Sequence, residues 1–170
     1  MKNHNNINIE GYFFKKSQGY IMKKFKLLLV LYFEDAEFFL LDKNSLIFFK
    51  RFSHKEGHSI KNRLRKSFTG FFAPKFSTSH KFDPHTSLKD SERIRFCKQV
   101  SCELRRLVNK LSISAIFISA GPKVLGEFRK HLTPDITKKI AVEITKNLGK
   151  LTTKEIEGYI IPIIKNKYQN

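Results

Sequence analysis

Three short apolar runs follow one another in the first third of the chain. Residues 25–32 are almost continuously apolar, and residues 37–41 and 46–52 are further aliphatic and aromatic runs. The turn at 42–45 contains Asp, Asn and Ser, whose side chains hydrogen-bond to nearby backbone and favour tight turns. This spacing predicts three strands in a meander that forms one side of a sheet.

A helical period follows further along the chain, after Ser87, which we interpret as the N-cap. Apolar side chains then recur at three- and four-residue steps, which predicts an amphipathic helix of about six turns. These apolar positions are Ile94, Cys97, Val100, Leu104, Leu107, Val108 and Leu111. The opposite face is basic and carries Arg93, Arg95, Lys98, Arg105 and Arg106.

In the last third of the chain, strand-like apolar runs alternate with helical patterns. Residues 114–119 predict a buried strand, and Gly121-Pro122 a turn into a helix that contains residues 124–132. A helical turn at Pro134 and a strand over 140–145 follow. Thr152 and Glu155 have capping-box spacing, which predicts a last helix that ends at about Ile161, before Pro162.

This order of elements is typical of an α/β fold, and 170 residues fit one domain. Residues 1–21 are rich in Asn and Lys without a sustained period, so we expect a disordered extension. Met22 stands directly before the first strand and is an alternative start. Residues 22–170 are then the domain, and residues 53–86, which lack periodicity, are expected to form a long basic loop.

The charge of the chain narrows the choice of partner. Lys and Arg number 33 against 15 acids, a net charge of +18. The segment 50–81 contains nine of these cations and one acid, and phenylalanines lie between them. Cations beside exposed rings are typical of proteins that bind phosphates and stack on unpaired bases, although the rings could instead pack under the loop. The predicted RNA contacts are Arg51, Lys61, Arg63, Arg65, Lys66, Phe68, Phe71, Phe72, Lys75 and Lys81.

Motifs for catalysis are missing from the sequence. It contains no GxSxG, P-loop, HExxH or CxxC pattern. His54 and His58 have the spacing of metal ligands on a helix, but the glycine between them disfavours that geometry. Cys97 and Cys102 point to different sides of the predicted helix and cannot share a ligand. We therefore predict no catalytic residue, metal, cofactor or small-molecule ligand.

The sequence also suggests where the protein resides. The longest apolar run, residues 27–33, is far shorter than the roughly 20 residues of a membrane span. Two cysteines are too few for a disulfide scaffold. A cytoplasmic protein without a transmembrane segment is expected.

Two stretches of the sequence resemble the bacterial host attachment protein family. The first contains Pro122, Leu125-Gly126, Leu132-Thr133-Pro134, Glu143 and Lys146. The second contains Phe52-Ser53-His54, then Asp83-Pro84-His85-Thr86, Glu92, Arg95 and Phe96. The resemblance covers about residues 22–160. It departs at 61–68, where the family usually has a stretch like Ser-Asp-Arg-Pro-Gly-Arg.

The resemblance implies a fold like the middle domain of archaeal and eukaryotic class I release factors. That fold is a three-layer-like domain, a mixed sheet with flanking helices. In release factors the loop before the long helix carries Gly-Gly-Gln, which enters the peptidyl-transferase centre. The equivalent residues 53–86 contain no Gly-Gly-Gln, so peptide release is not expected.

Three hypotheses for function follow. The leading one is a non-enzymatic module that contacts RNA or the ribosome through the basic, Phe-rich loop. The second takes the family name literally and predicts a host-cell attachment factor that acts through a protein partner or an anionic membrane surface. The third is a nuclease-like hydrolase, for which paired carboxylates are not apparent in the sequence.

Overall fold

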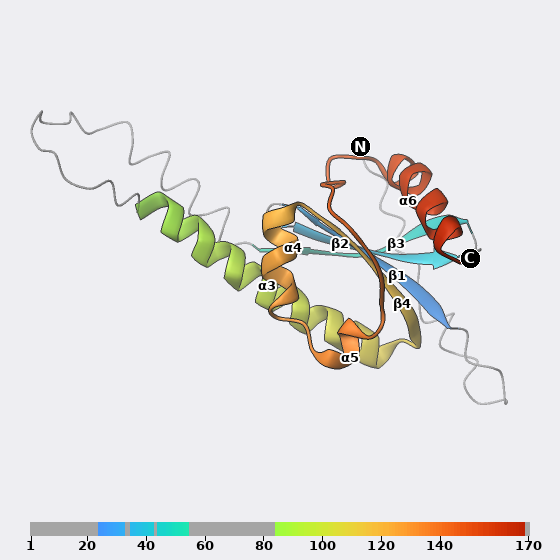
Figure 1. Ribbon diagram of the computed structural model, residues 1–170, viewed down its shortest axis with the longest axis horizontal. Coiled ribbons are helices and arrows are strands. Elements are labelled where there is room, and N and C mark those ends of the chain that lie inside the picture. Colours follow the sequence, from blue (N-terminus) through green and yellow to red (C-terminus); the bar gives the residue numbers. More distant parts are fainter. Residues whose placement is uncertain (1–23, 33–34, 43, 55–83, 169–170) are drawn as a thin grey trace, which may run out of the picture.

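The structure is a computed structural model that describes residues 24–32, 35–42, 44–54 and 84–168 (Figure 1). A five-stranded sheet of order β3-β2-β1-β4-β5 lies at its centre. The strands are β1 (Phe25–Tyr32), β2 (Asp35–Asp42), β3 (Ser45–Ser53), β4 (Ile113–Ala120) and β5 (Ile140–Ile144). β1, β2 and β3 pair antiparallel as the predicted meander, whereas β4 pairs parallel with β1 and with β5. The predicted mixed α/β sheet is confirmed.

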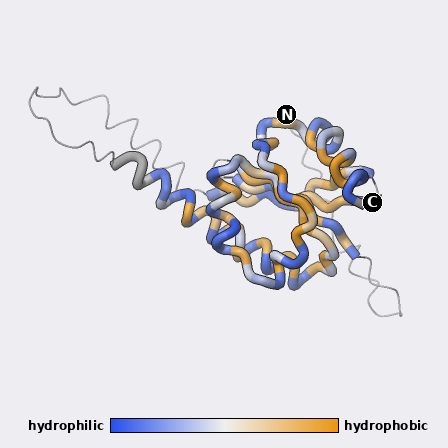
Figure 2. Tube along the Cα trace, in the orientation of Figure 1, coloured by the Kyte–Doolittle hydropathy of each residue, from blue (hydrophilic) through white to orange (hydrophobic). Residues whose placement is uncertain are grey.

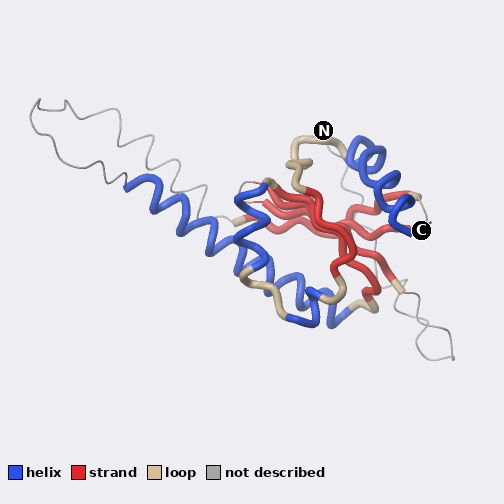
Figure 3. Tube along the Cα trace, viewed as in Figure 1, coloured by secondary structure: helices blue, strands red, loops and turns tan. Residues whose placement is uncertain are grey.

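Helices cover both faces of this sheet and complete three layers (Figure 3). α3 (Pro84–Lys110), α4 (Pro122–Arg129) and α5 (Pro134–Thr137) pack on one face. α6 (Thr153–Tyr168) packs on the other. The extension expected at 1–21 lies outside the described residues and stays a prediction.

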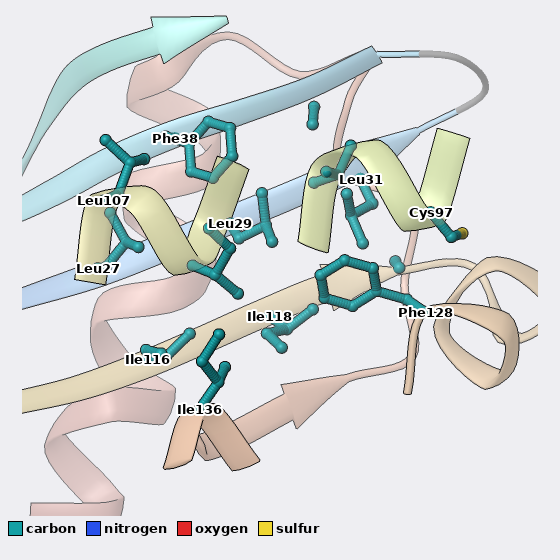
Figure 4. Packing of buried hydrophobic residues seen from close by; sticks show 14 of the residues in the cluster. Leu27, Leu29, Leu31, Phe38, Cys97, Leu107, Ile116, Ile118, Phe128 and Ile136 are labelled. Carbon is teal, nitrogen blue, oxygen red and sulfur yellow. The ribbon is translucent and has the colours of Figure 1, made fainter. Parts of the chain in front are cut away.

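The two cores follow from the alternation of side chains along β1. Leu27, Leu29 and Leu31 point toward the layer of three helices and are fully buried (Figure 4). Leu28 and Val30 point toward α6 and are equally buried. Because β1 is buried on both sides, it contains a continuous apolar run, and Figure 2 shows the sheet as the most hydrophobic part of the trace.

α3 begins earlier than the sequence predicted, at Pro84 and not after Ser87. Proline is favoured in the first turn of a helix because its missing N–H has no intrahelical partner there. The helix does not pack evenly along its length. From Lys89, where its side chains are first described, the first buried one is Phe96, and the N-terminal turns of the helix extend away from the sheet (green in Figure 1).

α6 corrects a second prediction, because it continues past Pro162 to Tyr168. The capping box at its start is confirmed: Thr152 N donates to Glu155 Oε2 (2.6 Å) and Glu155 N to Thr152 Oγ1 (3.4 Å). Proline removes one helical hydrogen bond. The apolar stripe of Ile156, Ile160 and Ile164 nevertheless continues across it, and all three side chains are buried against the sheet. Packing of this stripe outweighs the local cost of the proline.

Within the described ranges, no helix is both long and apolar enough to cross a membrane.

Candidate nucleic-acid interface

A groove of about 630 Å³ lies between the end of β3 and the outer face of α3. β3 is an edge strand of the sheet, and His54, which follows its last residue, contacts α3. Among the residues that the structure describes, nothing closes the groove along α3. Its lining residues are Phe52, Ser53, His54, Arg95, Lys98, Gln99, Cys102, Glu103 and Arg106.

His54 connects the two walls of the groove. Its side chain is only 2% exposed, and both ring nitrogens are engaged: Nδ1 lies 2.7 Å from Gln99 Oε1 and Nε2 lies 2.8 Å from Glu92 Oε2. Ionised Glu92 can only accept, so Nε2–H donates to it. The Gln99 amide can turn either its oxygen or its NH₂ group toward Nδ1. His54 therefore holds the end of β3 to α3.

Two aromatic rings support this connection from the core side. Phe52 on β3 and Phe96 on α3 have ring centroids 6.4 Å apart, and Phe96 also lies 6.5 Å from the His54 ring. These distances fall within the usual range for interacting rings. The structure thus brings together Phe52 and His54 with Glu92 and Phe96, which are distant in the sequence.

Positive charge follows the α3 wall of the groove. Arg95 and Arg106 have side chains 55% and 80% exposed, and Lys98 is also exposed. With 3.6 residues per turn, these three positions lie on one side of the helix. Their cationic groups are therefore presented together to solvent.

One acid, Glu103, also lines the groove. Lys50 Nζ on β3 lies 2.6 Å from its Oε1, and Arg106 Nη1 lies 3.6 Å from its Oε2. Lys50 therefore balances the negative charge of Glu103, and the groove keeps its net positive charge.

The two cysteines lie in different surroundings, as the helical spacing predicted. Cys102 lines the groove and is partly exposed. Cys97 is fully buried, and its thiol lies 3.9 Å from the carbonyl oxygen of Val124 on α4. Burial raises the pKa of Cys97 to about 12, with a smaller contribution from the nearby Glu127 carboxylate. Only Cys102 is thus placed to react with a thiol reagent in the folded protein.

Arg51, one of the predicted RNA contacts, lies in a polar cluster on the α6 face of the sheet. Arg51 Nη2 donates to Asp35 Oδ2 (2.8 Å), and Arg51 Nη1 lies 3.8 Å from Glu37 Oε1. The hydrogen bond to Asp35 raises the pKa of Arg51. Its guanidinium lies beside two buried carboxylates and offsets part of their charge. Contact between Arg51 and RNA stays a prediction.

Tyr32 closes this cluster and donates to Glu37 Oε1 (3.0 Å). Burial, followed by the charge of the Glu37 carboxylate, raises the pKa of Tyr32 well above its ordinary value. Gly149 passes directly over the Tyr32 ring: a Cβ atom on Gly149 would lie 2.5 Å from Tyr32 Cβ and closer still to the ring. The position accepts no larger residue without movement of the backbone.

The other predicted RNA contacts lie outside the described residues and stay predictions: Lys61, Arg63, Arg65, Lys66, Phe68, Phe71, Phe72, Lys75 and Lys81. The basic face of α3 was predicted from the helical period, but its residues are not among the predicted RNA contacts. The signal that could have added it is the stripe Arg95, Lys98 and Arg106 on the helix that follows the basic segment. Nothing in the sequence indicated that His54 would pair with Glu92 and Gln99.

Metal chemistry has no visible support in the described part of the chain. No group of three or more His, Cys, Asp or Glu side chains there could hold a metal ion.

This α/β domain with a five-stranded mixed sheet is similar to known proteins. A family model described as "Protein required for attachment to host cells" matches residues 28–160, and the chain belongs to this family. The resemblance predicted from the sequence is thereby confirmed. An uncharacterised protein of Rickettsia prowazekii (strain Madrid E) is 31% identical over 104 residues, which are 60% of this chain and 67% of that protein.

Solved structures give more distant similarities. An archaeal protein has a TM-score of 0.39 at 14% identity, covering 74% of this chain and 31% of its own. An archaeal translation termination factor has a TM-score of 0.39 at 12% identity, covering 84% of this chain and 39% of its own. The chain thus spans about a third of the length of these two proteins.

Proposed function

We propose that this member of the host attachment family is a non-enzymatic RNA-binding module of the cytoplasm, with the ribosome as its candidate target. The observation that supports the proposal most is the grouping of Arg95, Lys98 and Arg106 along one groove of a chain with net charge +18. A cleft lined by one sign of charge focuses the field and attracts ions of the opposite sign.

The position of the groove in the chain adds to this argument. His54 lies at the end of the groove where β3 leads into the basic segment, and α3 begins where that segment ends. Cations of the segment, among them Arg63, Arg65 and Lys66, would add phosphate contacts, and its phenylalanines would stack on bases. Phosphate and stacking contacts contain little base information, so we expect sequence-tolerant binding.

Retention of single-stranded RNA by the purified protein, measured at several salt concentrations, tests the proposal. Binding through phosphates releases counterions, so the affinity should fall steeply as salt rises. Arg63, Arg65 and Lys66 replaced together by Glu should weaken binding strongly. Retention that is independent of salt would overturn the proposal. Retention that survives these substitutions would exclude the segment as a contact and leave only the groove.

The ribosome as target is tested by sedimentation of a cell lysate through a sucrose gradient. We expect the protein to migrate with ribosomal particles at low salt and as a free protein at high salt. Migration as a free protein at both salt concentrations would rule out the ribosome while leaving other RNA as a target.

A second candidate function rests on the family description, attachment to host cells. The same cations could bind an anionic membrane surface, where each contributes about 1 kcal/mol. Cell fractionation separates the two candidates. Recovery at the cell surface would favour attachment, and recovery only from the cytosol would exclude it.

A further inference from the structure

The groove defines a more specific mode of binding, which rests on the proposed function. We infer that one single strand of RNA lies along α3 in the groove, with its phosphates against Arg95, Lys98 and Arg106. Apart from Arg51, the residues predicted from the sequence lie in the segment 55–83. This site is different because it is built from β3 and α3.

The three cations form a row long enough for one strand to contact them together. A helix rises 1.5 Å per residue, so Arg95 and Lys98 are about 4.5 Å apart along the axis, and Lys98 and Arg106 about 12 Å. The row therefore extends over about 16.5 Å of the helix axis, longer than a single nucleotide.

The shape of the site favours a strand over a flat surface. The cations line a recess between two elements, and its volume of about 630 Å³ is large enough to hold a nucleotide-sized group. A membrane surface would meet the outer rim of such a recess, whereas a strand can enter it along its open length. The inference therefore commits to RNA.

The acids beside the groove are already paired within the protein. Glu92 accepts from His54, and Glu103 accepts from Lys50. Neither needs a groove cation as its main partner, since Arg95 Nη1 lies 3.9 Å from Glu92 Oε1 and Arg106 Nη1 lies 3.6 Å from Glu103 Oε2. The pair of Arg106 with Glu103 is long and highly exposed, so it is weak and a phosphate can compete for that arginine.

The first test compares two triple variants with equal loss of charge. The groove variant is R95Q/K98Q/R106Q, and the matched control is K138Q/K150Q/K154Q, three exposed lysines outside the groove. Each phosphate contact on a single strand contributes about 0.7 to the slope of log K against log salt. The groove variant should thus lose about 2 from that slope and bind about 100-fold more weakly at 0.1 M salt. The control should keep most of its slope.

The second test uses Cys102 as a reporter in the groove. A thiol reagent should modify Cys102 in the native protein, while buried Cys97 reacts only after denaturation and so serves as an internal control. A 12-nucleotide RNA should slow modification of Cys102 at least several-fold. A mononucleotide at equal phosphate concentration should not, because it cannot bridge the three cations.

Three results would overturn the inference. If the protein binds RNA while the slope of the groove variant matches that of the control, or while Cys102 stays unprotected, the strand lies elsewhere and the proposed function stands. Protection by the mononucleotide alone, or by phosphatidylserine vesicles and not by RNA, would replace the strand with a different ligand. If the unsubstituted protein binds no RNA, the proposed function itself fails.

Discussion

Replacing His54 by Phe should destabilise the fold by breaking the link between β3 and α3. The phenyl ring keeps the contact with Phe96 but has no nitrogen to donate. Glu92, whose side chain is 13% exposed, then loses its charge-assisted hydrogen bond. Gln99 is exposed and can turn to water instead. The expected cost is therefore that of one poorly solvated carboxylate, about 2 kcal/mol.

Urea unfolding followed by circular dichroism measures this cost. For a domain of this size a loss of about 2 kcal/mol lowers the midpoint by roughly 1 M. His131→Phe is the matched control, because His131 also pairs with a glutamate, Glu127, at 3.1 Å. Glu127 keeps a second partner, Lys130 Nζ at 2.8 Å, so loss of His131 should leave the midpoint nearly unchanged.

A double-mutant cycle identifies the source of the effect. In a chain that already has H54F, Glu92→Leu removes the unpaired carboxylate and should restore part of the stability. The two substitutions should then be clearly less costly together than the sum of their separate effects. Equal midpoints for H54F and H131F, or simple additivity in the cycle, would refute the view that His54 stabilises the fold through Glu92.

Three further predictions concern positions away from the groove. Gly149→Ala should lower the unfolding free energy by about 1–3 kcal/mol or more, because the added methyl group overpacks against Tyr32. Gly126→Ala, in an open position on α4, should raise it by about 0.5–1 kcal/mol. Thermal unfolding distinguishes the two variants. The fold raises the pKa of Tyr32, so the contribution of Tyr32 to stability is present below pH 10 and is lost as the pH rises further. Tyr32→Phe should therefore flatten the decline in unfolding free energy between about pH 9 and 11. Thr152→Ala should remove the N-cap of α6 at a cost of about 1 kcal/mol, and an unchanged melting temperature would show that the cap contributes nothing.

Local patterns in the sequence were sufficient for most elements of the fold. The meander, the strands at 113–120 and 140–144 and the capping box at Thr152 each depend on neighbouring residues, which a sequence shows directly. The predicted end of α6 was wrong because Pro162 was taken to end the helix, as proline does when only its local effect counts. The burial of Ile164 beyond it depends on the sheet, which lies elsewhere in the sequence.

The site was harder to predict because its parts meet only in three dimensions. Helical spacing was enough to show a basic face on α3, and it separated Cys97 from Cys102 correctly. It could not show that the end of β3 lies opposite that face, since this depends on how the helix crosses the sheet edge. His54 illustrates the limit: the sequence argued against a metal site with His58 but gave His54 no other role, whereas the fold engages both its ring nitrogens with α3.

The sheet order also has a consequence for how the chain folds. Leu29 on the central strand pairs with Phe38, close in sequence, and with Ile118, about 90 residues away. The hairpins of β1, β2 and β3 can form early, and closure of β1 against β4 is then the slow step. Closure entropy grows only with the logarithm of loop length, so shortening the segment between His54 and α3 by about 25 residues would change it by only about 0.3 kcal/mol. Folding therefore constrains the length of this segment only weakly.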